Sequence, residues 1–213
     1  MHRGISANFL SKRYLQGGIA CVLGSLILFP IDSIGAEPAA PYNVTVWANA
    51  VFNEEGKVQK LDYSSLAAHA QGFLDQLRPA LMRGRITPPV HNGTPASLQS
   101  GIRVTVYIIP APTGSTFRIS NLDLQPLPIK TYKPDSVFDS NGGFAAKYSL
   151  EATCEVSETG RCTEVNITTS DAVPESFRRA VRDAYKRWEF EPQRINGVAV
   201  KGKASMAFSL ILE

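Results

Sequence analysis

An internal repeat constrains the fold of this 213-residue chain more than any other feature of its sequence. Gly56 and Gly160 are 104 residues apart (160 − 56). The same offset aligns further residues without a gap: Phe73 with Phe177, Ala80 with Ala184, Arg83 with Arg187, Pro88 with Pro192, and Asn92-Gly93 with Asn196-Gly197. A constant offset with matching turn residues is typical of a duplicated structural unit. The sequence therefore predicts two related domains, residues 44–109 and residues 144–213.

The second copy has the pattern of two strands, a helix and a strand. Residues 147–156 and 162–168 flank a turn at Gly160, where glycine can adopt positive φ. Pro174 suits the first position of a helix, and residues 205–212 alternate like a final strand. The three-four spacing of a buried stripe selects Val173, Phe177, Ala180, Val181, Ala184 and Trp188. We interpret the arginines on the other helix faces as a solvated surface, with an anion site as the alternative.

The first copy repeats this order with changes. Residues 44–52, 58–63 and 102–109 are its expected strands, and Ser64 or Ser65 can cap a helix that begins at Leu66. Pro79 should kink or divide that helix, because proline cannot donate an internal hydrogen bond. Gly84 stands where the second copy has Trp188, so this copy lacks the large aromatic anchor. Between the copies, the proline-rich residues 110–143 are interpreted as an extended, partly ordered connector.

Residues 1–36 have the layout of a cleaved export signal. Arg3, Lys12 and Arg13 precede an apolar stretch that ends near Pro30, and Ala36 is a small residue at the expected cleavage point. The alternative is a retained inner-membrane anchor, because the apolar run is nearly long enough to cross a bilayer. Cleavage would leave 19 basic and 18 acidic side chains (22 − 3 and 19 − 1). We therefore expect a periplasmic protein that does not bind nucleic acid, which requires a clear basic excess.

Two of the three cysteines remain after cleavage, and we expect them to form a disulfide. Cys21 lies in the signal, which leaves Cys154 and Cys162 on either side of the Gly160 turn. An even pair in an oxidising compartment favours a bridge. Directly opposite in a hairpin their Cα atoms would lie ~4.5–5.5 Å apart, and one step off they would lie ~7–8 Å apart. A redox pair is the alternative, although no helix begins between them to lower a thiol pKa.

The sequence holds no recognisable catalytic or metal-binding pattern. Its histidines are His2, His69 and His91, and no His/Cys/carboxylate spacing suits zinc. It also lacks a glycine-rich phosphate loop after a strand and a nucleophile elbow. We expect a protein that is not an enzyme and has no cofactor.

The second copy resembles a known family. Trp188-Glu189-Phe190-Glu191-Pro192, then Asn196-Gly197 and a strand that ends Phe208-Ser209-Leu210, resembles the C-terminal domain of TonB, the energy transducer of the Gram-negative envelope. The resemblance reaches the first copy only through the repeat, as a degenerate domain. It predicts an α+β fold of two tandem β-β-α-β units, each a helix packed on a small antiparallel sheet. The expected structural core of the second copy is Phe177, Val181, Trp188, Phe190, Pro192 and Gly197.

The resemblance implies binding without catalysis. Domains of the family offer a sheet edge to an extended peptide of an outer-membrane transporter, and main-chain hydrogen bonds then supply the affinity. Carried over, the edge is residues 203–212, and residues 102–109 are its counterpart in the first copy. The candidate partner-binding residues are Lys203, Ser205, Ala207 and Ser209.

Three functions are consistent with these features. The first is a periplasmic protein-binding module that acts in envelope or outer-membrane transport by strand addition. The second is a membrane-anchored TonB-like transducer, although the stretch from Glu37 to Tyr42 would reach only ~20 Å from its anchor. The third is a small-ligand carrier that uses the groove between the copies, with the Cys154–Cys162 bridge stiffening one wall. Contact with the membrane is expected only if the N-terminal segment is retained.

Overall fold

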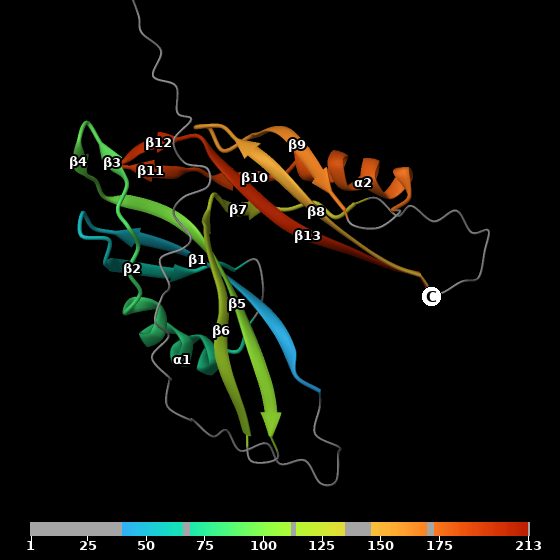
Figure 1. Ribbon diagram of the computed structural model, residues 1–213, viewed down its shortest axis with the longest axis horizontal. Helices are drawn as coiled ribbons and strands as arrows, with labels where there is room; N and C mark the ends of the chain where they lie inside the picture. The colour runs from blue at the N-terminus through green and yellow to red at the C-terminus, as the bar shows by residue number, and fades with distance from the viewer. Residues whose placement is uncertain (1–39, 66–68, 112–113, 135–145, 170–172, 213) are drawn as a thin grey trace, which may run out of the picture. The chain divides into compact units, whose positions relative to one another are not determined.

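The structure, a computed structural model, describes residues 40–65, 69–111, 114–134, 146–169 and 173–212 (Figure 1). The expected signal or anchor, residues 1–36, lies outside this part of the chain. The described residues divide into two compact units. The first comprises the residues up to Leu98 together with Arg103–Asp123, and the second comprises Gln99–Ile102 together with the residues from Leu124 onward.

Most of the described chain is β-structure, so the expected α+β fold of two β-β-α-β units is wrong. Strands hold 58% of the described residues, and the helices among them are two short ones. The proline-rich segment expected to be a connector contains β6 (Gly114–Gln125) and β7 (Leu127–Lys130). Further short strands flank the two Asn-Gly turns: β3 (Val90–His91), β4 (Thr94–Pro95), β11 (Gln193–Ile195) and β12 (Val198–Val200). These strands form because their backbone groups find partners on other strands, which local alternation does not reveal.

The first unit is built on antiparallel strands that one helix covers. β1 (Tyr42–Phe52) pairs with β2 (Val58–Tyr63), from Ala48 opposite Tyr63 to Phe52 opposite Val58. β5 (Leu98–Ala111) has both β1 and β6 as neighbours. Alternate residues of β5 are buried, as expected for a strand with one face on the core. The core of this unit includes Val46, Ala48, Ala50, Phe52, Leu61, Leu77, Leu81, Val104 and Val106.

The helix of the first unit, α1 (Gln71–Met82), differs from its prediction in two ways. It begins at Gln71 rather than Leu66, with Ala70 as its N-cap. It also continues through Pro79, so the expected division of the helix at this residue does not occur. The missing hydrogen bond is tolerated because Leu77 and Leu81 are buried against the unit, and helices in proteins are held mainly by such packing. The hydroxyl of Tyr63 donates to Leu74 O at 2.9 Å, and burial raises the pKa of that phenol.

The second unit contains a three-stranded antiparallel sheet under the other helix (Figure 1). The order is β13 (Gly202–Leu212), β8 (Ala146–Val156) and β9 (Cys162–Thr168). Helix α2 (Glu175–Lys186) has Pro174 as its N-cap, and every residue of the expected stripe except Ala180 is buried. A two-stranded ladder joins β7 to β10 (Glu189–Glu191). Among the described residues, no helix is long and apolar enough to cross a membrane.

The turns at Gly56 and Gly160 have the same geometry. Their φ angles are +74° and +76°. A Cβ on Gly56 would lie 1.9 Å from the carbonyl oxygen of Ile86, and one on Gly160 would lie 1.9 Å from that of Phe190. Each glycine oxygen accepts a hydrogen bond from the same partner residue, at 3.0 and 2.9 Å respectively. Both turns therefore need glycine for its left-handed φ and for its lack of a side chain.

Candidate partner-binding edge

The four candidate partner-binding residues all lie on an edge strand. β13 pairs with β8 along its whole length, from Gly202 opposite Val156 to Leu212 opposite Ala146. Among the described residues, no strand pairs with its other side. Lys203, Ala207 and Ser209 are exposed, and Ser205 is half-buried. The edge expected at residues 203–212 is therefore the place where β13 could accept another strand.

The two faces of β13 differ in character. Ala204 is buried in the core, and Met206 and Phe208 pack against it from the same face. Lys203, Ser205 and Ala207 face the other side, where their neighbours on β8 are Glu155, Thr153 and Glu151. Lys203 Nζ lies 3.3 Å from a carboxylate oxygen of Glu155, and the Ser205 hydroxyl bonds to Glu151. One face is thus apolar and the other carries carboxylates.

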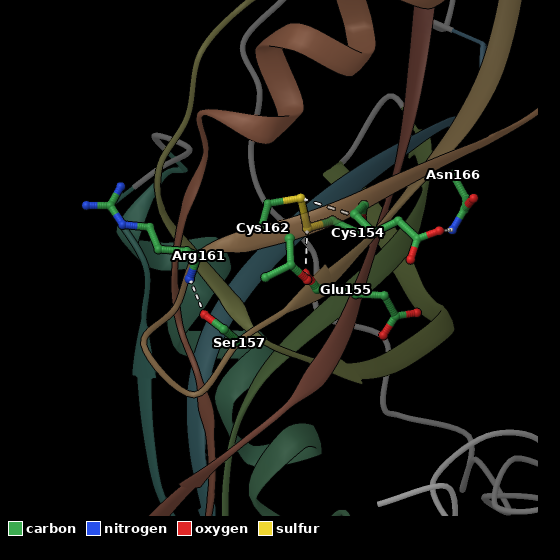
Figure 2. The surroundings of a disulfide bond; sticks show 8 residues. Cys154, Glu155, Ser157, Arg161, Cys162 and Asn166 are labelled. Atoms are coloured by element: carbon green, nitrogen blue, oxygen red, sulfur yellow. Dashed lines mark hydrogen bonds between the residues drawn. A yellow bond between two sulfur atoms is a disulfide. The ribbon is translucent and has the colours of Figure 1, made fainter.

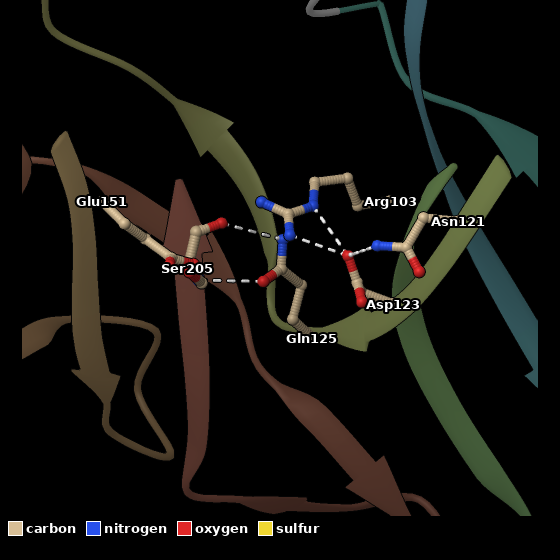
Figure 3. Close-up of polar contacts among 6 residues, drawn as sticks. All are labelled: Arg103, Asn121, Asp123, Gln125, Glu151 and Ser205. Atoms are coloured by element: carbon tan, nitrogen blue, oxygen red, sulfur yellow. Dashed lines mark hydrogen bonds and ion pairs between the residues drawn. The ribbon is translucent and has the colours of Figure 1, made fainter. Parts of the chain in front are cut away.

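Gln125 closes the edge at Ser205 (Figure 3). The Ser205 N–H donates to Gln125 Oε1 at 2.8 Å, and Gln125 Nε2 donates to the Ser205 carbonyl at 3.4 Å. Both Ser205 groups therefore turn away from β8, and the side-chain amide takes the place that a peptide group of a neighbouring strand would fill. Gln125 could not be identified from the sequence, because no local pattern marks a contact between residues 80 positions apart.

Gln125 belongs to a buried segment, residues 125–128, which we call the strap. All four of its residues are buried, and Gln125 is only 3% exposed. A Cβ on Gly202 would lie 2.8 Å from Pro126 Cγ, so the strap closely approaches the beginning of β13. Pro126 has no N–H to donate to β13, and the strap residues after it, Leu127 and Pro128, pair with β10 instead. The strap therefore covers the edge at Gly202–Ser205 without extending the sheet.

Beyond Ser205 the edge has the geometry that an added strand requires. In an antiparallel strand the N–H and C=O of one residue point to the same side, and the side alternates along the chain. Because the Ser205 groups turn away from β8, those of Ala207, Ser209 and Ile211 do so as well. The structure thus limits the open edge to residues 207–211, which is shorter than the predicted one.

The counterpart edge in the first unit, on residues 102–109 of β5, has β6 as its neighbour. Arg103 donates to Asp123 from Nε at 3.0 Å and from Nη2 at 2.7 Å, and Asn121 donates to the same carboxylate (Figure 3). The Ser120 hydroxyl also donates to Thr105 O at 3.0 Å. These contacts fix the ladder, so the first copy's edge is occupied by a strand of the same chain.

The predicted disulfide is confirmed (Figure 2). Cys154 lies opposite Val165 and Cys162 lies opposite Val156, so the bridge is diagonal rather than direct. The Cα atoms are nevertheless 5.7 Å apart, less than expected for a diagonal pair, because the register shifts between Glu155 and Val156. Cys154 is fully buried within the core that α2 covers. The bridge therefore ties the hairpin together inside the core of the second unit.

The predicted core residues occupy different environments. Phe177, Val181, Trp188 and Phe190 are buried. Pro192 is half-buried, and Gly197 lies in an exposed turn with φ +78°, where its role is conformational.

Trp188 is the centre of an aromatic cluster. Its ring centroid lies 4.8 Å from that of Tyr185, 6.1 Å from Phe190 and 6.0 Å from Phe208. Its Nε1 donates to Tyr132 O at 2.9 Å, which satisfies its one polar group. The Arg187 guanidinium lies 4.4 Å from the Tyr132 ring centroid, and hydrogen bonding to Tyr132 raises the pKa of Lys130. Trp188 thereby joins the helix, the last strand and the segment after β7.

The described residues do not contain a group of three or more His, Cys, Asp or Glu that could hold a metal ion. The first unit has a polar surface hollow lined by Asn53, Glu54, Glu55, Gln59 and Ser97. Its lining differs from the apolar walls that small-molecule sites usually have. We therefore regard the β13 edge as the candidate site. No protein-family model, curated protein or solved structure matches the chain.

Proposed function

We propose that this protein is a periplasmic binding module that acts in envelope transport, taking up an extended segment of another envelope protein by β-strand addition at β13. The binding mode is that of the TonB C-terminal family, which the second copy resembles in sequence. The observation that carries the proposal is the edge position of β13, where Ala207, Ser209 and Ile211 direct their backbone groups away from β8. Main-chain hydrogen bonds along such an edge supply affinity for an extended peptide.

The composition of the edge supports this proposal. Exposed edge strands usually carry charges, prolines or bulges that prevent unwanted pairing. β2 has such charges, because Lys60 and Asp62 lie on it as an exposed ion pair. From Ala207 to Ile211, β13 has neither a charged residue nor a proline. An edge kept free of these devices is expected where strand pairing is part of the function.

Photo-crosslinking in cells tests the proposal. A photoreactive residue at Ala207 or at Ser209 should give adducts to another envelope protein, which mass spectrometry then identifies. Arg179 and Asp183, exposed positions on α2, are the controls and should not give that adduct. Adducts from the edge that are confined to this chain itself would contradict the proposal.

A matched pair of substitutions separates strand addition from general proximity. Ser209→Pro removes an N–H that points away from β8, so pairing with β8 is kept while one hydrogen bond to the partner is lost. Ser209→Ala changes the side chain but keeps the N–H. With the photoreactive residue at Ala207, we expect the adduct to be strongly reduced by Ser209→Pro and unchanged by Ser209→Ala. Equal adduct yields in both variants would exclude main-chain pairing at this position.

A further inference from the structure

The first unit contains a natural example of a strand added to the edge of β5. On β6, two successive residues contact different elements, one the helix α1 and the other the strand β5. Phe117 makes an edge-to-face contact with Phe73 of α1 at 5.6 Å between ring centroids. The guanidinium of Arg118 lies over the Tyr107 ring of β5, 5.0 Å from its centroid. An aromatic residue thus packs under the helix, while the basic residue beside it lies along the sheet.

The β13 edge offers an aromatic ring on one face and a carboxylate on the other to a strand with the same alternation. On the face covered by α2, Phe208 is only partly buried and contacts Tyr185 at 5.7 Å between ring centroids. On the opposite face, Glu151 lies directly across from Ala207 and is exposed. Neighbouring strands are separated by about 4.8 Å, so a residue added opposite Ala207 would be about two spacings from Glu151. Because the side chain of Ala207 is small, a long basic side chain on the added strand could extend across it to the Glu151 carboxylate.

Gln125 sets the limit of this surface. Its amide already occupies both outward groups of Ser205, so an added strand can begin to pair only at Ala207. Pro126, which follows Gln125, comes close to Gly202 and covers the edge on the other side of Ser205. The Gln125 amide therefore takes the place of a neighbouring peptide group at Ser205, and a short peptide can pair only from Ala207 onward.

On the basis of the proposed function, we propose that the β13 edge binds an extended peptide in which an aromatic and a basic side chain alternate between the two faces, as Phe117 and Arg118 do on β6. The peptide pairs with residues 207–211 and places its basic residue opposite Ala207, where that residue reaches Glu151. The aromatic residue next to it packs beside Phe208. Gln125 is the positioning residue that fixes the register by excluding the peptide from Ser205.

A synthetic peptide with the sequence of residues 115–123, which contains the Phe117-Arg118 pair, is the probe. Fluorescence anisotropy measures its binding to the purified protein, and amide NMR shifts locate it. We expect shifts at Ala207 and Ser209 but not at Ser205. Replacing the peptide's arginine by glutamate should weaken binding by about fivefold or more, the upper range for an exposed charge pair reversed in sign. Binding that is insensitive to this reversal, or absent, would overturn the proposal.

Two protein variants provide the controls. Glu151→Gln should abolish the difference between the arginine and glutamate peptides, because it removes the charge that distinguishes them. Gln125→Ala should extend the NMR shifts to Ser205, and shifts confined to Ala207 and Ser209 in that variant would show that Gln125 does not set the register. A second copy of the chain found on the edge would overturn the choice of occupant. If an envelope partner is crosslinked from Ala207 but its segment lacks this alternation, the inference fails while the proposed function stands.

Discussion

The edges of β5 and β13 show how the same sequence pattern can have different consequences. Ile102 to Ile109 in β5 aligns with the end of β13 at the offset of 104 that relates the two Asn-Gly pairs (196 − 92). In the first unit that edge is paired with β6, a strand of the same chain. In the second unit the strap covers the edge as far as Ser205, and residues 207–211 have no described strand on the side away from β8. A strand of the same chain thus closes the edge of β5, whereas no described strand closes the edge of β13 beyond Ser205.

The cores of the two units also differ in the residues that stabilise them. The second unit has Trp188 and the Cys154–Cys162 bridge, whereas the first has Gly84, Ala50 and Val58 at the corresponding positions. The first unit instead receives the Phe117 ring from β6 against α1. A large buried indole and a covalent bridge therefore stabilise the second unit, whereas the first unit has the packing of β6 against α1 instead.

Trp188→Ala should cause the largest loss of stability, and that loss should be confined to the second unit. Loss of a buried indole and its hydrogen bond typically costs ~3–5 kcal/mol of unfolding free energy. Hydrogen exchange measured by mass spectrometry should show that protection is lost in β8 and β9 and kept in β1 and β2. An unchanged melting curve with full protection in β8 would refute the core assignment.

Reduction of the Cys154–Cys162 disulfide should cause the second-largest loss of stability. Opening a bridge that closes a short loop is expected to cost ~2–3 kcal/mol. The denaturation midpoint of the second unit should fall in reductant, and that of the first unit should not change. A Cys154→Ala/Cys162→Ala variant, which has no bridge to reduce, is the control and should not respond to reductant. An equal fall in the denaturation midpoints of both units would show that the bridge does not stabilise the second unit selectively.

Phe117→Ala should destabilise the first unit by about 1–2 kcal/mol, the scale of a half-buried aromatic contact. The substitution weakens the attachment of β6, so the amides of β5 from Arg103 to Ile109 should exchange faster. Protection in β8 and β13 is expected to be the same as in the unchanged protein. If β5 exchange does not respond, β6 does not depend on this ring for its position.

Gln125→Ala should have the smallest effect on stability, about 1 kcal/mol for a side-chain amide that bonds to a backbone group. Exchange of the Ser205 amide should accelerate, because its acceptor is lost. Gln125→Glu is the matched variant, since it keeps an acceptor for that amide and removes only the donor. We expect a smaller change in Ser205 exchange for Gln125→Glu than for Gln125→Ala. Identical exchange in the two variants would show that the Oε1 contact does not protect this amide.

Much of the local structure could be predicted from the sequence, and the disulfide was predicted correctly. Gly160 and its turn were recognisable because only glycine adopts that φ without strain beside a close carbonyl. The start of α1 could not be predicted correctly. Ser64 and Ser65 are plausible caps, and yet the helix begins at Gln71. The fold class was wrong because a proline-rich segment gave no sign that Gly114–Gln125 would pair along β5.

What the sequence by itself determined is local: the left-handed turns, the alternation of β13, the buried stripe of α2 and a cysteine pair close enough to bridge. These follow from the conformational limits of single residues and from the periods of strand and helix. Only the tertiary structure decided which edges are filled. The strand on β5 and the Gln125 amide on Ser205 depend on contacts between distant residues, the latter separated by 80 positions. Such contacts satisfy the backbone N–H and C=O groups that the folded chain brings close together. No local sequence pattern specifies which distant residues come into contact.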